Sequence, residues 1–284
     1  MKEIRIGGVP EHFNLAWYLA LKEKSFQKAG INLRWKDYFG GTGEMNKALR
    51  NNEIDMAVIL TEGIVRDIIK GNKSKIVQVF VKSPLIWGVH VAENSNFETI
   101  PDLKGKHAAI SRFGSGSHLM AYIQAKNQGW DITEDLKFKV IEDLEGALNG
   151  LPAGKGDYFM WEKFTTKPYV DNGIFRRVGN CPTPWPCFVI AVRNEVLEND
   201  MESIQTILKI INQETLDFKK LAGIDNIIST RYNQQLEDVQ EWLSLTEWSQ
   251  EQLTESALEE IQNQLFNLNL IDKIVPSQNI LHKV

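Results

Sequence analysis

Two short glycine-containing segments carry residue types that could bind a polar ligand. Gly40-Gly41-Thr42-Gly43-Glu44 follows a predicted strand and opens a predicted helix, and residues 111–118 repeat this arrangement further along the chain. Glycine lets a backbone approach a ligand closely, and the N–H groups at a helix start attract negative charge. The second segment adds serine hydroxyls, which suit an anionic or strongly polar group. The first segment by itself is also typical of a tight turn in which Thr42 caps the helix.

Further polar and aromatic side chains lie where other predicted strands end. They occur in the turn 10–14, at 61–62, at 161–162 and in the segment 180–187, where three prolines restrict the backbone around Trp185. Ligands of open α/β sheets bind outside the carboxyl ends of the strands. Packing in the core is the alternative for each of these side chains. The candidate ligand-binding residues are Pro10, His12, Asn14, Phe39, Gly40, Gly41, Thr42, Thr61, Glu62, Arg112, Gly114, Ser115, Gly116, Ser117, His118, Trp161, Glu162 and Trp185.

Three of these side chains admit more than one role. Arg112 offers either a charge for the ligand or a solvated side chain. His118 lies in the first turn of a predicted helix, where a neutral hydrogen-bonding imidazole is expected rather than a metal ligand. The indole of Trp185 has a flat face that could stack on a ring of the ligand, or it fills the junction between two parts of the chain.

Patterns that indicate catalysis or nucleic-acid binding do not occur. The chain has no G-x-S-x-G elbow and no H-E-x-x-H helix, and its 5 histidines are scattered without metal-ligand spacing. Its glycine segments lack the dinucleotide-binding spacing and the lysine of a P-loop. The net charge of −5 disfavours nucleic acid, whose phosphates require a basic surface. We therefore expect a binding protein that is not an enzyme and needs no cofactor or metal.

The elements that position the candidate residues alternate between strand and helix patterns. Strands are predicted at residues 2–7, 31–39, 55–60, 75–81, 86–92, 107–111, 138–142, 156–161 and 189–193. Helices are predicted at residues 14–29, 42–51, 62–70, 117–128 and 143–150, and from 201 almost to the end of the chain. Strand and helix in turn imply an α/β fold with parallel sheets covered by helices.

The bulk composition is that of a globular protein. Of the 284 residues 43% are hydrophobic and 24% charged, and no apolar run approaches the roughly 20 residues of a membrane span, so no membrane insertion is expected. Met1 is followed almost at once by a predicted strand, which favours a cytoplasmic protein; with a signal segment removed, it would be periplasmic or lipid-anchored. Cys181 and Cys187 form either a local disulfide or two reduced thiols.

The order of these motifs resembles that of a known fold. The segments 102–106, 114–117 and 156–162, preceded by 32–60, are similar to the type II periplasmic-binding-protein fold. The resemblance is to the branch of ABC-transporter solute-binding proteins for alkanesulfonate, taurine, nitrate and thiamine-precursor pyrimidines. It covers about the first 200 residues. Glu162 differs from the aspartate that often follows the tryptophan in this family.

The resemblance implies two lobes joined by two crossovers, with a small-molecule ligand clamped in a cleft between them. We expect residues 1–86 and 190–284 to form one lobe and residues 87–189 the other. The ligand would be a sulfonate-like anion or a pyrimidine thiamine precursor, and an ABC permease would be a partner if the protein is exported. One alternative is a thiamine-pyrimidine synthase-like enzyme, although its cysteine-rich iron motif is not matched here. Another alternative is an intracellular ligand sensor or delivery module.

Overall fold

The chain forms two compact units in a computed structural model that describes residues 1–284. Unit 1 consists of Met1–Ser83 and Trp185–Val284, and unit 2 consists of Pro84–Pro184. The chain therefore passes between the units twice. The boundaries expected from the sequence, at 86/87 and 189/190, differ from these by a few residues. Residues 185–189 belong to unit 1 because Phe188 and Val189 pair in its sheet.

Unit 1 is built on a five-stranded sheet with the order β2-β1-β3-β10-β4. Its strands are β1 (Lys2–Gly8), β2 (Ile31–Asp37), β3 (Met56–Leu60), β4 (Ser74–Val81) and β10 (Phe188–Arg193). Strands β1, β2 and β3 are parallel, whereas β10 runs antiparallel to both β3 and β4. All six residues of β10 are buried, as expected for a strand covered on both faces.

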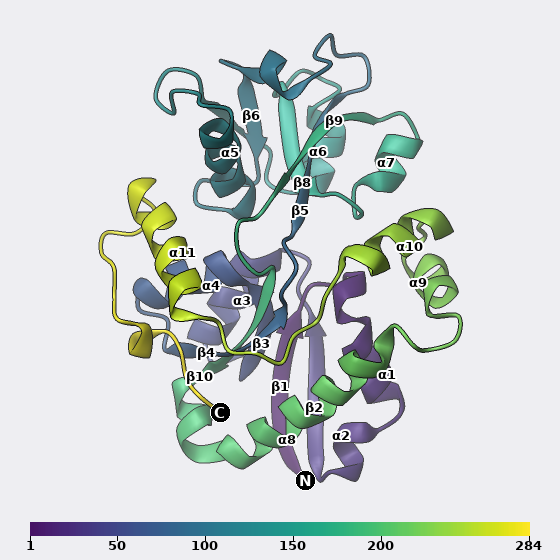
Figure 1. Cartoon of the computed structure of the whole chain (residues 1–284), viewed down its shortest axis with the longest axis vertical. Coiled ribbons are helices and arrows are strands. Elements are labelled where there is room, and N and C mark those ends of the chain that lie inside the picture. Colours follow the sequence, from purple (N-terminus) through teal and green to yellow (C-terminus); the bar gives the residue numbers. More distant parts are fainter. The chain divides into compact units, whose positions relative to one another are not determined.

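Helices cover both faces of this sheet (Figure 1). The helices of unit 1 are α1 (Leu15–Lys22), α2 (Ser25–Lys28), α3 (Gly41–Arg50), α4 (Thr61–Ile69), α8 (Asn194–Phe218), α9 (Ile224–Tyr232), α10 (Leu236–Leu245) and α11 (Glu255–Asn267), with the 3-10 turns η1 (His12–Asn14) and η3 (Ser277–Asn279). Helix α1 packs against α8, and α4 against α3 and α11. The single helix expected at 14–29 is wrong, because Lys24 adopts a left-handed conformation (φ 58°) that separates α1 from α2.

Unit 2 repeats the strand layout of unit 1. Its sheet has the order β7-β6-β8-β5-β9, and it contains β5 (Ile86–Ala92), β6 (His107–Ile110), β7 (Lys137–Val140), β8 (Tyr158–Glu162) and β9 (Phe175–Pro182). Its helices are α5 (Gly116–Asn127), α6 (Leu144–Gly150) and α7 (Lys167–Asp171), with the 3-10 turn η2 (Ile100–Leu103). Strand β5 is antiparallel to β8 and β9, and β6 is parallel to β7 and β8.

The shared layout places the two glycine segments at different positions of the two sheets. Residues 40–43 follow the outer strand β2, whereas residues 111–118 follow β6, which holds the place that β1 has in unit 1. The two segments are thus not structural repeats of each other. The counterpart of residues 111–118 in unit 1 is the turn 9–14 after β1. The counterpart of Glu62, just after β3, is Glu162 at the end of β8.

The outer edge of β4 is covered by the C-terminal part of the chain. Val79 N donates to Glu251 O (2.8 Å) and Ser249 N donates to Phe80 O (3.0 Å). Further along the strand, Ile76 N donates to Ile280 O (2.8 Å). The expectation of helix almost to the C-terminus is therefore wrong for residues 246–254, which run extended beside β4. This pairing satisfies an edge strand that would otherwise be open to other chains.

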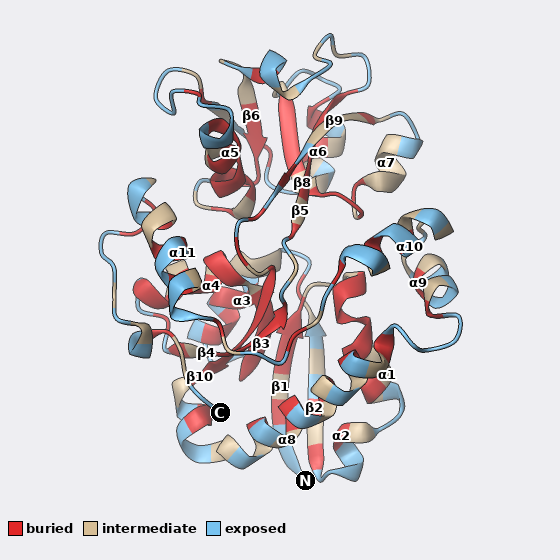
Figure 2. Cartoon of the chain, in the orientation of Figure 1, coloured by how far each residue is buried: buried red, intermediate tan, exposed pale blue.

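Burial concentrates on the strands of both sheets, as Figure 2 shows. A charged side chain of unit 1, that of Asp55, lies in this core. Asp55, just before β3, is 7% exposed and accepts hydrogen bonds from Arg5 Nη2 (2.7 Å) and Arg193 Nη2 (2.9 Å). These two arginines hold the pKa of Asp55 below its usual value. The carboxylate thus ties together β1, β3 and β10.

Replacing Asp55 tests this tie. Asp55→Ala leaves two arginines without their common acceptor, and removing one partner of a buried ion pair costs about 3 kcal/mol or more. We expect that loss in the free energy of unfolding, measured with urea. Glu3→Ala is the control, because Glu3 pairs with Arg34 on the surface (2.7 Å), where a pair contributes about 1 kcal/mol or less. Equal losses in the two variants would contradict the role of Asp55.

Candidate functional site

The parallel strands of unit 1 bring several predicted residues to one edge of the sheet. The turns after β1, β2 and β3 contain residues 9–14, 38–42 and 61–62, and all leave at the carboxyl ends of these strands. Because β10 is antiparallel to β3, the segment that enters it, with Trp185, also lies at this edge. We call these residues the unit 1 edge.

The turn after β1 is packed against aromatic rings. His12 is 1% exposed, and its ring contacts Trp242 edge-on at a centroid distance of 4.3 Å. Burial lowers the pKa of His12 to about 3, so the imidazole is neutral. Asn14 is fully buried, and its Nδ2 donates to Val9 O (2.8 Å). Its Oδ1 accepts no hydrogen bond from the protein, which is rare for a buried polar atom. Pro10 is partly exposed in the same turn.

The turn after β2 is the most exposed part of the unit 1 edge. Phe39 is 84% exposed. Gly40, not Thr42, is the N-cap of α3, so the expected cap is wrong. The Gly40 N–H donates to the carboxylate of Glu44 (2.9 Å), four residues along the chain. Gly41 has φ 64°, which only glycine adopts readily. The start of α3 therefore already holds a negative charge.

The turn after β3 joins two distant parts of the chain. The Thr61 hydroxyl donates to Pro186 O (2.6 Å), so it holds the segment that enters β10. The Trp185 indole Nε1 donates to Glu62 Oε2 (2.8 Å), and both side chains are 3% exposed. Burial raises the pKa of Glu62 to about 7, although the start of α4 and the Trp185 bond favour its charged form. Contact between Trp185 and a ligand stays a prediction.

The corresponding turn of unit 2 begins helix α5. Ser115 is the N-cap, and its hydroxyl accepts the His118 N–H (3.3 Å). Ser117 Oγ accepts the Ser111 N–H (3.0 Å) and lies 3.0 Å from Ser115 Oγ. His118 Nδ1 accepts the Gly114 N–H (2.9 Å). The hydroxyls are therefore linked to one another and to the backbone, while Gly116 and the exposed Arg112 flank them.

An aromatic group surrounds His118, and the sequence-based residue set did not include it. The His118 ring lies 4.6 Å from Phe138, 4.9 Å from Tyr122 and 5.3 Å from Phe113, measured between centroids. Phe113 is 66% exposed. Its position between Arg112 and Gly114 in the glycine segment was the available signal. Phe138 and Tyr122 come from β7 and α5, so only the fold brings them together.

The end of β8 holds the other predicted residues of unit 2. The Trp161 ring stacks on Phe159 at 5.4 Å and is partly exposed. Glu162 is buried, and its Oε2 accepts the N–H groups of Phe164 (3.0 Å) and Thr165 (2.6 Å). Burial raises the pKa of Glu162. Unlike Glu62, this carboxylate is committed to its own turn.

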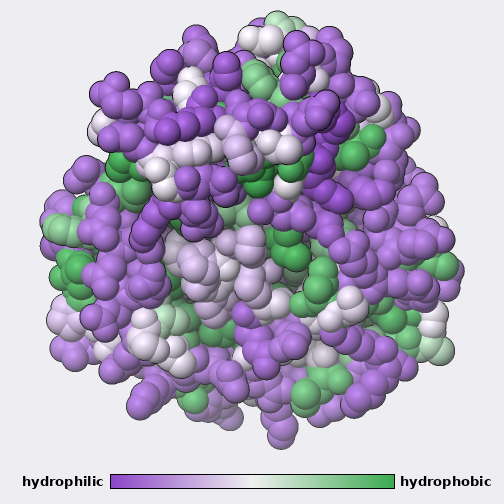
Figure 3. Space-filling model, turned by 45° about the horizontal axis from the view of Figure 1, so that its top comes forward, coloured by the Kyte–Doolittle hydropathy of each residue, from purple (hydrophilic) through white to green (hydrophobic).

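Outside these turns few side chains are of types that take part in catalysis or metal binding. Cys181 and Cys187 are buried, and neither forms a disulfide. No cluster of three or more histidine, cysteine or acidic side chains is placed to hold a metal ion. No helix has the length and apolarity that crossing a membrane requires. On the face shown in Figure 3 hydrophilic side chains predominate, and apolar ones form small separate patches.

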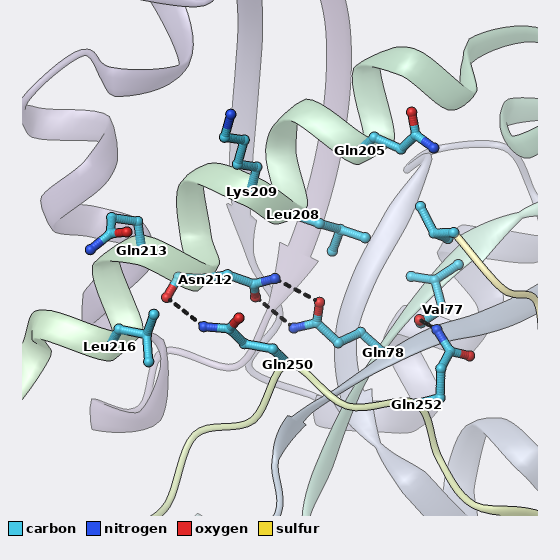
Figure 4. Close-up of a pocket in the computed structure, with 11 residues that line it drawn as sticks. Val77, Gln78, Gln205, Leu208, Lys209, Asn212, Gln213, Leu216, Gln250 and Gln252 are labelled. Atoms are coloured by element: carbon cyan, nitrogen blue, oxygen red, sulfur yellow. Dashed lines mark hydrogen bonds between the residues drawn. The ribbon is translucent and has the colours of Figure 1, made fainter.

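Two cavities of unit 1 lie away from the predicted residues. The larger, of about 440 Å³, is bounded by α8, β4 and residues 250–252 (Figure 4). Its amide side chains bond to one another: Gln78 and Asn212 exchange two hydrogen bonds of 2.7 and 3.0 Å. The smaller cavity, of about 340 Å³, lies beside the start of β4 and includes Lys73 and Lys273.

Comparison with solved structures identifies the fold. Over its whole length the chain superposes, with a TM-score of 0.90 and 24% identity, on 97% of the Candida albicans CA3427 gene product, described as defining a new family with the generic periplasmic binding protein fold. The alkanesulfonate-binding protein SsuA of Xanthomonas axonopodis pv. citri, solved with bound MOPS, matches with a TM-score of 0.84 and 18% identity, again over the whole chain and 99% of that protein. The Escherichia coli aliphatic sulphonate binding protein SsuA matches with a TM-score of 0.79 and 17% identity, over the whole chain and 92% of that protein.

The chain thus has the type II periplasmic-binding-protein fold, as the sequence motifs predicted. Residues 87–181, most of unit 2, match the family model of Ca3427-like PBP. No curated protein matches the chain. The two SsuA proteins named above are sulfonate-binding proteins.

The raised pKa of Glu62 makes a testable contribution to stability. Between the unfolded value of 4.5 and the folded value of about 7, the folded protein binds the extra proton, so stability falls as the pH rises through this window. Glu62→Gln removes this dependence while keeping an acceptor for Trp185. We expect the free energy of unfolding of the variant to exceed that of wild type by up to about 3 kcal/mol at pH 8, and by little at pH 4.5.

Urea unfolding at several pH values measures this difference. Glu259→Gln is the matched control, because Glu259 is exposed on α11. The curve of the control should run parallel to that of wild type. If the free energies of unfolding of Glu62→Gln and wild type differ by the same amount at every pH from 4.5 to 8, Glu62 does not titrate as described.

Proposed function

We propose that this protein captures a small polar organic molecule with an anionic, sulfonate-like group, as a solute-binding protein of the ABC-transporter type. The two units would close on the ligand by a hinge motion at their two connections, and an ABC permease would be the partner of an exported form. The fold supports a binding role, because SsuA proteins of the same fold bind sulfonates. The protein would act without catalysis and without a cofactor.

The observation that carries this proposal is the start of α5. This helix has 12 residues and no acidic side chain in its first turn. The buried hydroxyls of Ser115 and Ser117 lie beside its first N–H groups. An N-terminus with this composition favours an anion, because its N–H groups carry partial positive charge and no carboxylate competes for them. The candidate residues at both sheet edges would complete the site.

A pyrimidine thiamine precursor is the second candidate ligand. The aromatic group of Phe113, His118, Tyr122 and Phe138 favours it, because these rings offer faces and edges for a flat heterocycle. Native mass spectrometry of protein purified from cells would identify a retained ligand. Isothermal titration with alkanesulfonates and with the pyrimidine would then rank the two classes. Small-angle scattering should show a smaller radius of gyration with ligand if the units close.

Replacing two serines tests the anion site. A hydrogen bond to a charged group contributes about 1.5–3 kcal/mol. The double variant Ser115→Ala/Ser117→Ala should therefore bind butane-1-sulfonate at least about tenfold more weakly in calorimetry. Ser244→Ala, an exposed serine on α10, is the control. A thermal melt of each variant separates lost affinity from lost folding. Unchanged affinity in a folded double variant would show that the start of α5 does not bind the sulfonate.

A further inference from the structure

A cavity of about 340 Å³ in unit 1 is lined by two positive charges and no carboxylate. It lies between the end of α4, the start of β4, the start of α8 and residues 273–279. Strands β3 and β4 are both antiparallel to β10, so they are parallel to each other. The start of β4 therefore lies at the opposite end of the strands from the unit 1 edge. We call this cavity the β4 cavity.

The two charges belong to Lys73 and Lys273, which are exposed and form no ion pair within the protein. Asp67 of α4 is engaged by Arg50, whose Nε donates to its Oδ2 (2.8 Å). Two like charges that line one cavity repel each other, and an anion between them is attracted by both. Because the chain has a net charge of −5, this local positive charge does not follow from its composition.

Amide and hydroxyl side chains line the same cavity. Asn72 is committed to the protein, since its Nδ2 donates to Asp67 Oδ2 (2.7 Å) and its Oδ1 accepts from Ser74 Oγ (2.8 Å). Asn194 differs, because its Oδ1 is buried without a hydrogen bond and its Nδ2 donates to no protein atom. A half turn of this amide exchanges its oxygen for its NH2 group without breaking a hydrogen bond of the protein. Asn194 can therefore donate to an anion in the β4 cavity.

Apolar side chains of the β4 cavity suit an organic group attached to the anion. Ile68 and Ile69, at the end of α4, are each 8% exposed, and Val275 lines the cavity with them. A phosphate group carries about −1.5 to −2 charge at pH 7 and three acceptor oxygens, which match two lysines and an amide donor. The cavity volume of about 340 Å³ lies within the range of about 300–1,000 Å³ that is usual for small-molecule sites.

We infer that the β4 cavity binds a phosphate monoester of a small organic molecule. Lys73 and Lys273 pair with the negative charge of its phosphate, and Asn194 donates a hydrogen bond to a phosphate oxygen. The two isoleucines contact the organic group. This site does not depend on the proposed function, because all its residues belong to unit 1 and lie away from the unit 1 edge.

Replacing both lysines tests this site. Glycerol 3-phosphate is the probe, and isothermal titration measures its affinity. Lys73→Gln/Lys273→Gln should bind the probe at least about tenfold more weakly, because each lysine contributes a charge-assisted hydrogen bond. Lys28→Gln/Lys47→Gln is the matched control, since it removes the same charge from two exposed lysines of unit 1 that form no ion pair. A thermal melt shows that each variant is folded.

Replacing Asn194 tests the unpaired amide. We expect Asn194→Ala to bind glycerol 3-phosphate several-fold more weakly. The melting temperature of the variant without the probe should match that of wild type, because the side chain makes no hydrogen bond within the protein. A lower melting temperature with unchanged affinity would show that Asn194 is structural and would overturn its role in binding.

Two further comparisons separate this site from that of the proposed function. Ser115→Ala/Ser117→Ala should bind glycerol 3-phosphate as wild type does, and the double lysine variant should keep the affinity of wild type for butane-1-sulfonate. Inorganic phosphate should bind wild type more weakly than glycerol 3-phosphate, because it lacks the organic group.

Several outcomes would overturn the inference while the sulfonate site stands. They are no binding of glycerol 3-phosphate to wild type, unchanged affinity in the folded double lysine variant, and an equal loss in that variant and its control. Loss of probe binding in the double serine variant alone would assign the phosphate to the start of α5 and would also overturn it. Equal affinity for inorganic phosphate and glycerol 3-phosphate would overturn the organic ligand in favour of free phosphate.

Discussion

The pairing of β10 between β3 and β4 is the constraint on which the rest of unit 1 depends. This strand enters the sheet only after the chain has built unit 2, and all its residues are buried. Without it, β3 and β4 would each have an open hydrogen-bonding side in the middle of the sheet. Because β10 is antiparallel to its neighbours, the chain leaves and re-enters unit 1 at the carboxyl edge. Trp185 and Pro186 thereby reach Glu62 and Thr61.

The charge at the sheet edges depends on which helices have a carboxylate in their first turn. Identical strand orders place a turn and a helix start at corresponding positions of both units. The first turns of α3 and α4 contain Glu44 and Glu62, whereas the first turn of α5 contains hydroxyl side chains and His118. The helix starts thus differ in charge within each unit, because α1 has no acid in its first turn whereas α6 begins with Asp143 and Glu145.

The buried side chains of Glu62 and Asn14 reduce the stability of unit 1, because their polar atoms are incompletely paired. Burial without a charged partner raises the pKa of Glu62, and Asn14 Oδ1 is left without a donor. Elsewhere in unit 1 buried charge is compensated: Asp55 accepts hydrogen bonds from two arginines. Uncompensated polar groups that persist beside well-paired ones mark places where function has been kept at the expense of stability.

Local sequence patterns determined the α/β class, most strands and helices and the turns at the strand ends, because these depend on spacings of two to four residues. They missed β9, whose residues 175–182 do not alternate regularly between apolar and polar and include glycine and proline, and they missed the break at Lys24. Only the tertiary structure decided which side chains distant in the sequence contact one another. Trp185 and Glu62 are 123 positions apart, and Phe138 of β7 packs against His118 and Tyr122 of α5. No local period encodes such contacts, because strand order brings distant residues together, and so only the fold shows which polar atoms remain unpaired.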